Sequence, residues 1–129
     1  MTDTTPTNLI SHVKESDAVK MIHNDVTINA VGKTVPIFIG DATQVTLLIS
    51  IGGETGAGTI LFKINVIESV SGDTIKTYDG TSLSAIGTDY IFIDSLTLGD
   101  YITVEWTAGA GTLNGANYFT NVTSRLIVK

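Results

Sequence analysis

The feature that most constrains this chain is its excess of β-branched residues. Thr, Ile and Val account for 47 of the 129 residues. Branched side chains lose conformational freedom in a helix and pack well on a pleated sheet, so a chain dominated by them favours strands. A domain of this length can bury roughly two thirds of the surface that its unfolded chain exposes. We therefore expect one all-β domain with its own core.

Turn-forming residues divide the chain into short runs. Gly, Asp and Asn recur between the apolar stretches, and each of these residues suits a tight turn. Strands at such regular spacing are typical of a sandwich or barrel. We predict strands over residues 18–23, 25–31, 34–39, 44–51, 58–68, 73–79, 89–94, 100–107 and 117–128.

Alternation of apolar and polar residues supports this prediction. Ile60, Phe62 and Ile64 face one side of their strand, whereas Lys63 and Asn65 face the other. This period of two is typical of a sheet with one buried face. The same period recurs in the predicted strands 44–51, 100–107 and 117–128. The fold class is therefore an antiparallel β-sandwich, either jelly-roll-like or immunoglobulin-like, because both types give short alternating strands.

The outward positions of these strands are mostly Thr, Ser and Asn rather than Lys and Glu. Such a surface is less strongly solvated than a charged one, so it is compatible with being covered by another subunit. Trp106 lies in phase with Ile102 and Val104, which places it in the core. Tyr101 lies out of phase with them and is the better candidate for an exposed aromatic residue.

The first residues differ from the rest of the chain. Residues 1–16 are polar and Thr-rich, interrupted by Leu9, Ile10 and Val13. One interpretation is a frayed terminus. The other is a docking arm that orders on a partner through these three apolar residues. We divide the chain into an N-terminal arm, 1–16, and a β-sandwich domain, 17–129, and expect a short helix within 8–22.

Charge and hydropathy exclude two classes of partner. The net charge is −6 with only seven Lys and Arg, whereas nucleic-acid binding depends on cations that meet phosphates. No apolar stretch approaches the roughly 20 residues that a membrane span needs. The opening residues lack the cationic start and apolar run of a signal peptide, so we expect synthesis in a cytoplasm.

No catalytic or metal-binding motif stands out. Cysteine is absent, and His12 and His23 are the only histidines and are not spaced as a ligand pair. The Gly-x-Ser-x-Gly elbow of many hydrolases is missing. Gly32-Lys33-Thr34 resembles the end of a phosphate-binding loop, but Thr27 stands where that loop needs a glycine. We therefore predict no enzyme, no catalytic residue, no metal and no cofactor.

Two weaker binding interpretations remain open. Several aspartates fall at predicted strand ends, where loops could gather calcium ligands, but no Asp-x-Asp-x-Asp-Gly loop supports such a site. These residues are Asp41, Asp73, Asp79, Asp89, Asp94 and Asp100. Alternatively, Tyr101 and Tyr118 could stack on sugar rings in a carbohydrate- or receptor-binding module of a phage tail or adhesin.

Four segments carry a resemblance to a known family. They are residues 38–44, 87–90, 99–106 and 125–129, within Thr-rich strands of low charge behind a polar leading arm. In these features the chain resembles the small β-sandwich decoration, or cement, proteins on the heads of tailed bacteriophages. The resemblance implies a homotrimer that binds the major capsid protein lattice from outside and stabilises it without catalysis. It also implies a location on the virion surface after synthesis in the host cytoplasm.

We expect the arm residues Leu9, Ile10 and Val13 to bind the capsid and the strand faces to form the contact between subunits. Three linked arms would combine weak contacts through their effective concentration.

Overall fold

The computed structural model describes residues 18–40, 42–68, 72–94 and 101–129. In these residues the regular structure consists of strands alone. They are β1 (Ala18–Ile28), β2 (Gly32–Lys33), β3 (Ile37–Phe38), β4 (Val45–Thr55), β5 (Thr59–Ile67), β6 (Thr74–Asp79), β7 (Gly87–Ile93), β8 (Tyr101–Ala110) and β9 (Tyr118–Val128). None of the described segments is a helix long and apolar enough to cross a membrane.

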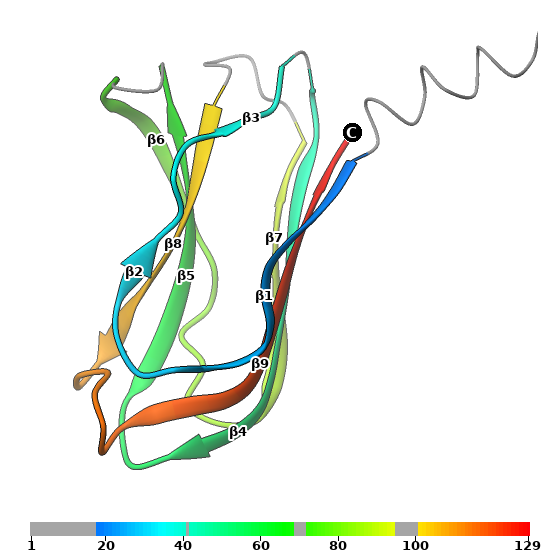
Figure 1. Ribbon diagram of the computed structural model, residues 1–129. Helices are drawn as coiled ribbons and strands as arrows, with labels where there is room; N and C mark the ends of the chain where they lie inside the picture. Colours follow the sequence, from blue (N-terminus) through cyan, green and yellow to red (C-terminus); the bar gives the residue numbers. More distant parts are fainter. Residues whose placement is uncertain (1–17, 41, 69–71, 95–100) are drawn as a thin grey trace, which may run out of the picture.

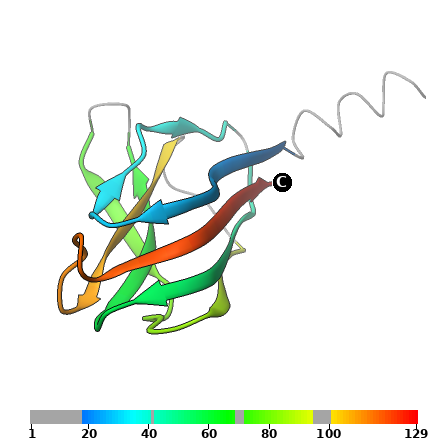
Figure 2. The same cartoon turned by 60° about the horizontal axis from the view of Figure 1, so that its bottom comes forward.

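The strands form two antiparallel sheets that face each other (Figure 1). Sheet A has the order β1-β9-β4-β7, and sheet B has the order β2-β8-β5-β6 with β3 also paired to β8. Figure 2 shows β1, β9 and β4 side by side in sheet A. The predicted antiparallel β-sandwich is therefore confirmed.

The strand order identifies the type of sandwich. Both β2 and β3 pair with β8, β2 through Gly32 and β3 through Ile37. When β2 and β3 are counted as one interrupted strand, each sheet holds four strands. Strands that follow each other in the sequence then lie in opposite sheets, except β5 and β6, which form a hairpin in sheet B. This is the order of a jelly roll, so the jelly-roll alternative holds and the immunoglobulin-like one does not.

The core lies between the inner faces of the two sheets. Phe62 of β5 and Leu47 of β4 are among its largest fully buried side chains. Each inner strand contributes alternate residues, as the sequence period of two predicts. The remaining fully buried large side chains are Ile49, Ile51, Ile60, Ile64, Ile102, Leu126, Val45, Val66, Val104 and Val122.

The first two predicted strands, 18–23 and 25–31, join into one strand in the structure, which ends at Ile28, so residues 29–31 were wrongly predicted. β1 continues through Asp25, which adopts a left-handed φ of 55°, and its register with β9 shifts there. The Asp25 N–H donates to Thr123 Oγ1 at 3.2 Å, and Asn121 Nδ2 donates to Asp25 Oδ1 at 2.9 Å. The first bond satisfies the Asp25 N–H of the bulge, and the second joins the side chains of the two strands, so β1 stays paired across the irregularity.

The glycines after residue 51 do not end their strand, contrary to the prediction. β4 runs on to Thr55, because Gly53 and Thr55 pair with Thr120 and Tyr118 of β9. A Cβ atom on Gly52 would lie 2.8 Å from the Asn121 Cβ, so glycine here permits close approach of β9.

Two further predictions need correction or fall outside the structure. The predicted strand 34–39 is reduced to β3, because β2 ends at Lys33 and Pro36 has no N–H to donate to a ladder. The predicted helix within 8–22 is wrong at residues 18–22, which belong to β1. Its remaining part and the arm 1–16 lie outside the described residues, so the arm stays a prediction.

Candidate functional site

The outward side chains of sheet A stand in rows across its four strands, because the pairing register aligns them. One row contains Val19, Ile127, Thr46 and Phe92, and the next contains Met21, Arg125, Leu48 and Tyr90. Six of these side chains are apolar and come from all four strands. We call this set the apolar face; it consists of Val19, Met21, Leu48, Tyr90, Phe92 and Ile127.

The apolar face is open to solvent in the isolated chain. Val19 is 62% exposed, Tyr90 66% and Phe92 50%. Leu48 and Ile127, at its centre, are half-buried. Single exposed apolar residues are common on protein surfaces, but a continuous apolar patch marks a surface that contacts a partner.

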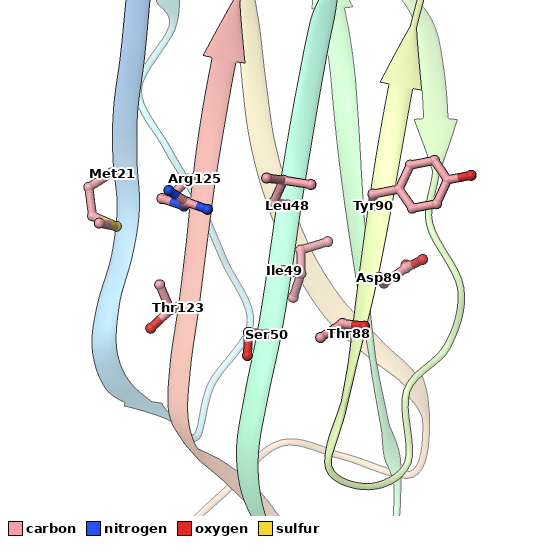
Figure 3. Close-up of a pocket in the computed structure, with 9 residues that line it drawn as sticks. All are labelled: Met21, Leu48, Ile49, Ser50, Thr88, Asp89, Tyr90, Thr123 and Arg125. Atoms are coloured by element: carbon pink, nitrogen blue, oxygen red, sulfur yellow. The ribbon is translucent and has the colours of Figure 1, made fainter.

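Arg125 lies in the middle of the apolar face. Figure 3 shows it on β9 between Met21 of β1 and Leu48 of β4. It is the only charged residue in the two described rows. A partner that covers this face must therefore offer the guanidinium an acceptor or an aromatic ring, because an unpaired buried charge is costly.

A row of hydroxyl groups borders the apolar face. Thr123, Ser50 and Thr88 share the next register row, one on each of β9, β4 and β7. An open hollow of about 830 Å³ spans these hydroxyls, Arg125 and Tyr90 (Figure 3). The hollow can thus accept both hydrogen bonds and apolar groups.

The outer face of sheet B is different, because its polar groups bond to one another. Asn65 Nδ2 donates to Thr103 Oγ1 at 3.1 Å and to Glu105 Oε1 at 3.0 Å. Asn65 Oδ1 accepts from Thr77 Oγ1 at 2.8 Å. We call this network, together with the adjacent register row Lys33, Glu105, Lys63 and Asp79, the polar face. Its central groups have partners within the chain.

His23 and Ser124 form the one His–Ser pair that the described residues bring together. A hydrogen bond of 2.7 Å joins His23 Nδ1 to Ser124 Oγ. The imidazole packs edge-on against Trp106 with ring centroids 4.3 Å apart. Burial lowers the pKa of His23, so the neutral form is favoured. Ser124 is fully buried between the sheets, and its bond to His23 joins β9 to β1. His23 and Trp106 line an open hollow of about 310 Å³.

The structure separates the two tyrosines that were candidates for stacking on sugars. Tyr101 lies in β8 of sheet B, where its ring centroid is 5.3 Å from that of Phe38. Tyr118 begins β9 of sheet A and pairs with Thr55 at the other end of the molecule (Figure 1). Both are half-buried. They do not form a common platform.

Several other residues singled out in the sequence lie against the core or outside the described part of the chain. Trp106 is half-buried against the core, as predicted. Leu9, Ile10 and Val13 lie outside the described residues. So do Asp41 and Asp100 among the candidate calcium ligands.

The described aspartates do not gather into a site. Asp89 accepts the Thr81 N–H at 2.7 Å, and Asp94 accepts from Gln44 Nε2 at 3.2 Å. Among the described residues, no group of three or more acidic or histidine side chains could hold a metal ion.

The apolar face is the feature that sequence reasoning missed. The prediction of outward Thr, Ser and Asn holds for Asn65, Thr103 and Thr77 of the polar face. It does not hold for the charged row of that face or for these two rows of sheet A. The missed signal was present in β7, where Tyr90, Ile91, Phe92 and Ile93 are apolar without alternation. Such a run indicates a strand with apolar groups on both faces.

Sequence and structure comparisons give different amounts of information. No protein-family model matches the sequence, and no curated protein matches it either. Among solved structures, the chain is similar to the SPBc2 prophage-derived protein YomS, with a TM-score of 0.52 and 12% identity over 88% of this chain and 93% of that one.

The fold is also similar to part of a virus particle chain. A chain of the T13 particle of infectious bursal disease virus matches with a TM-score of 0.54 and 11% identity over 88% of this chain. A chain of the Gx strain of the same virus matches with a TM-score of 0.50 and 9% identity over 87% of this chain. This chain spans 31% and 32% of those two chains. At such identities the likeness establishes a shared fold, the jelly-roll sandwich.

Proposed function

We propose that this protein is a non-catalytic structural component of a bacteriophage virion. It binds the outside of the capsid as a decoration, or cement, protein and acts as a trimer. The observation that carries the proposal is the apolar face, since a continuous exposed apolar surface around one cation is suited to a permanent protein partner.

The comparisons support the proposal at the level of the fold. A jelly roll serves many functions, and virus capsid domains are among them. The similar structures include a prophage-derived protein and chains of an icosahedral virus particle. The low charge of the chain supports a surface that neighbours cover in part.

In this proposal the N-terminal arm anchors the protein to the major capsid protein lattice. Leu9, Ile10 and Val13 of the arm would order on the shell and bury their side chains there. Three arms from one trimer would bind together, so that moderate individual contacts give tight attachment. Neither nucleic acid nor membrane takes part.

The direct test adds the purified full-length chain to capsids that lack it and images them by electron cryomicroscopy. The expected result is density for three copies at each three-fold or quasi-three-fold position on the outer surface. The triple variant Leu9→Asp/Ile10→Asp/Val13→Asp should occupy these positions at least tenfold less. A chain that leaves capsids bare at saturating concentration contradicts the proposal, and unchanged occupancy by the triple variant rules out the arm as anchor.

The alternative, a monomeric carbohydrate- or receptor-binding module, predicts a different result. It requires glycan binding that depends on Tyr101 or Tyr118. Binding of a glycan array by a monomer, lost in Tyr101→Ala or Tyr118→Ala, would favour it over the capsid proposal.

A further inference from the structure

The apolar face has two halves that complement each other. Val19 and Met21 lie on the edge strand β1, whereas Tyr90 and Phe92 lie on the opposite edge strand β7. One half is aliphatic and carries a thioether, and the other is aromatic. Thioether–aromatic and aliphatic–aromatic contacts are favourable pairings. Within one copy the halves are three strand spacings apart, about 14 Å, so they cannot meet.

The register of sheet A lets these halves meet between copies. Val19 shares a row with Phe92, and Met21 shares a row with Tyr90. A rotation axis parallel to the strands keeps every row at the same height. Such an axis therefore brings Val19 opposite Phe92 of the next copy and Met21 opposite Tyr90 of the next copy.

Arg125 finds a suitable environment in the same arrangement. It lies in the row of Met21 and Tyr90, so the Tyr90 ring of the next copy approaches it. The ring offers a π face to the guanidinium group. The hydroxyls of Thr123 and Ser50 in the adjacent row can accept its remaining hydrogens.

Charge favours this face over other surfaces as the contact between copies. The chain carries 13 acidic residues against seven Lys and Arg, so two copies repel each other through most orientations. The two rows of the apolar face contain no carboxylate. Copies that meet through them bury apolar groups. Asp89, which lines the adjoining hollow, already accepts a hydrogen bond from the Thr81 N–H.

The outer side of sheet A, which contains the apolar face, is also large enough. β1, β4 and β9 each have 11 residues, and β7 has 7. Three strands about 36 Å long and one about 23 Å long, each about 4.8 Å wide, give roughly 630 Å². A stable interface buries about 800 Å² on each partner, so sheet A with its edges offers nearly the required area.

We infer that the apolar face of sheet A is a self-association surface whose partner is a second copy of this chain. The β1 half of one copy packs against the β7 half of the next. Closure into three rests on the proposed function: three copies turn their apolar faces toward a common axis parallel to the strands.

Cysteine cross-linking tests this inference without background, since the chain contains no cysteine. The full-length double variant Met21→Cys/Tyr90→Cys is oxidised with copper–phenanthroline and run on a non-reducing gel. A disulfide requires Cβ atoms about 3.5–4.5 Å apart, so the two new thiols of one copy cannot join. The expected product is a covalent ladder that stops at three chains.

A matched control distinguishes cross-links formed at a specific interface from cross-links formed by random collision. Phe38 is 66% exposed, the same fraction as Tyr90, but lies on the outer side of sheet B. The variant Phe38→Cys/Tyr90→Cys should give no ladder that stops at a defined size. A stop at two chains in the test variant keeps the self-association surface and overturns three-fold closure. Monomer alone, or the same ladder in test and control, overturns the inference.

The cross-linking and capsid-binding experiments together distinguish failure of the self-association surface from failure of the proposed function. A chain that stays monomeric after oxidation but still decorates capsids overturns the self-association surface and the trimer, and keeps the decoration role. Covalent trimers that leave capsids bare overturn only the decoration role. Thermal melts of all variants that match the wild type confirm that the substitutions leave the fold intact.

Discussion

The two outer faces of the sandwich differ in how their side chains are satisfied. On the polar face of sheet B, Asn65 bonds to Thr103, Glu105 and Thr77, so its central groups already have partners. On the apolar face of sheet A, Tyr90 and Phe92 expose rings that none of the described residues covers. The same β-rich composition therefore produces one face whose central polar groups are already hydrogen-bonded. The other face exposes apolar groups, whose burial against a partner would be favourable.

This contrast separates residues that stabilise the fold from residues that mediate assembly. Substitutions in the core and on the polar face should lower the free energy of unfolding of one copy. Substitutions on the apolar face should leave that free energy nearly unchanged and reduce association. The predictions below test this separation and are measured in the Tyr90→Glu background, so that association does not contribute.

Substitutions of two phenylalanines should give the largest difference in the free energy of unfolding. Phe62 is 1% exposed in the core, whereas Phe92 is 50% exposed on the apolar face. Phe62→Ala should lower the free energy of unfolding by about 3–5 kcal/mol, since it leaves a cavity. Phe92→Ala should change it by about 0.5 kcal/mol or less. Urea unfolding followed by circular dichroism measures both, and equal losses would contradict the separation of roles.

Substitutions of Asn65 and Leu48 compare how much the centre of each face contributes to the stability of one copy. Asn65→Ala should cost about 1–3 kcal/mol, because Thr77, Thr103 and Glu105 lose a partner in a buried setting. Leu48→Thr introduces a β-branched residue, which suits a strand, and should cost about 1 kcal/mol or less. The same urea titration compares them. A larger loss for Leu48→Thr would show that the apolar face belongs to the fold of one copy.

His23, which lies between the sheets rather than on either face, should make stability depend on pH. Its pKa is lowered by burial in the folded state, so the unfolded chain binds a proton more readily. Stability is complete above the unfolded pKa of about 6.5 and falls as the pH drops below it, by at most about 1.4 kcal/mol per pH unit for one proton. Thermal melts between pH 7.5 and 5 should show this decrease.

The variant His23→Gln is the control for that titration. Its melting temperature should fall less steeply over the same pH range, because the group that the unfolded chain protonates is removed. Identical slopes in the two proteins would assign the pH dependence to the carboxylates instead.

Substitutions in the charged row of the polar face should have the smallest effect on the free energy of unfolding. Lys63 is paired in register with Glu105 on one side and Asp79 on the other. Lys63 and Glu105 are half-buried. Lys63→Ala should cost about 0.2–1 kcal/mol, as is usual for cross-strand charge pairs near the surface. The cost should shrink at 1 M NaCl; a cost that is unchanged by salt would assign it to packing of the aliphatic stem.

The sequence predicted the sandwich well because its period of two directly reports which side of a strand is buried. Ile60, Phe62 and Ile64 are all buried, as alternation requires. Strand ends were less predictable. β4 continues past Gly52 because β9 approaches closely there, a tertiary contact that no local pattern encodes.

The candidate surface was harder to predict, because it depends on which strands are neighbours. Met21 and Tyr90 are far apart in the sequence and share a row only through the register of β1, β9, β4 and β7. The alternation of each strand alone cannot reveal such a row. The strand order was also the information that distinguished the jelly roll from the immunoglobulin-like alternative.

The most direct test of the central claim, that copies associate through the apolar face and not the polar one, is sedimentation equilibrium. It compares the wild-type chain with Tyr90→Glu and with the equally exposed Phe38→Glu. The wild type and Phe38→Glu should both sediment at about three times the 13.6 kDa mass of one chain, and Tyr90→Glu as a single chain. A wild-type chain that stays at 13.6 kDa at every concentration, or a Tyr90→Glu variant that associates as the wild type does, would contradict the claim.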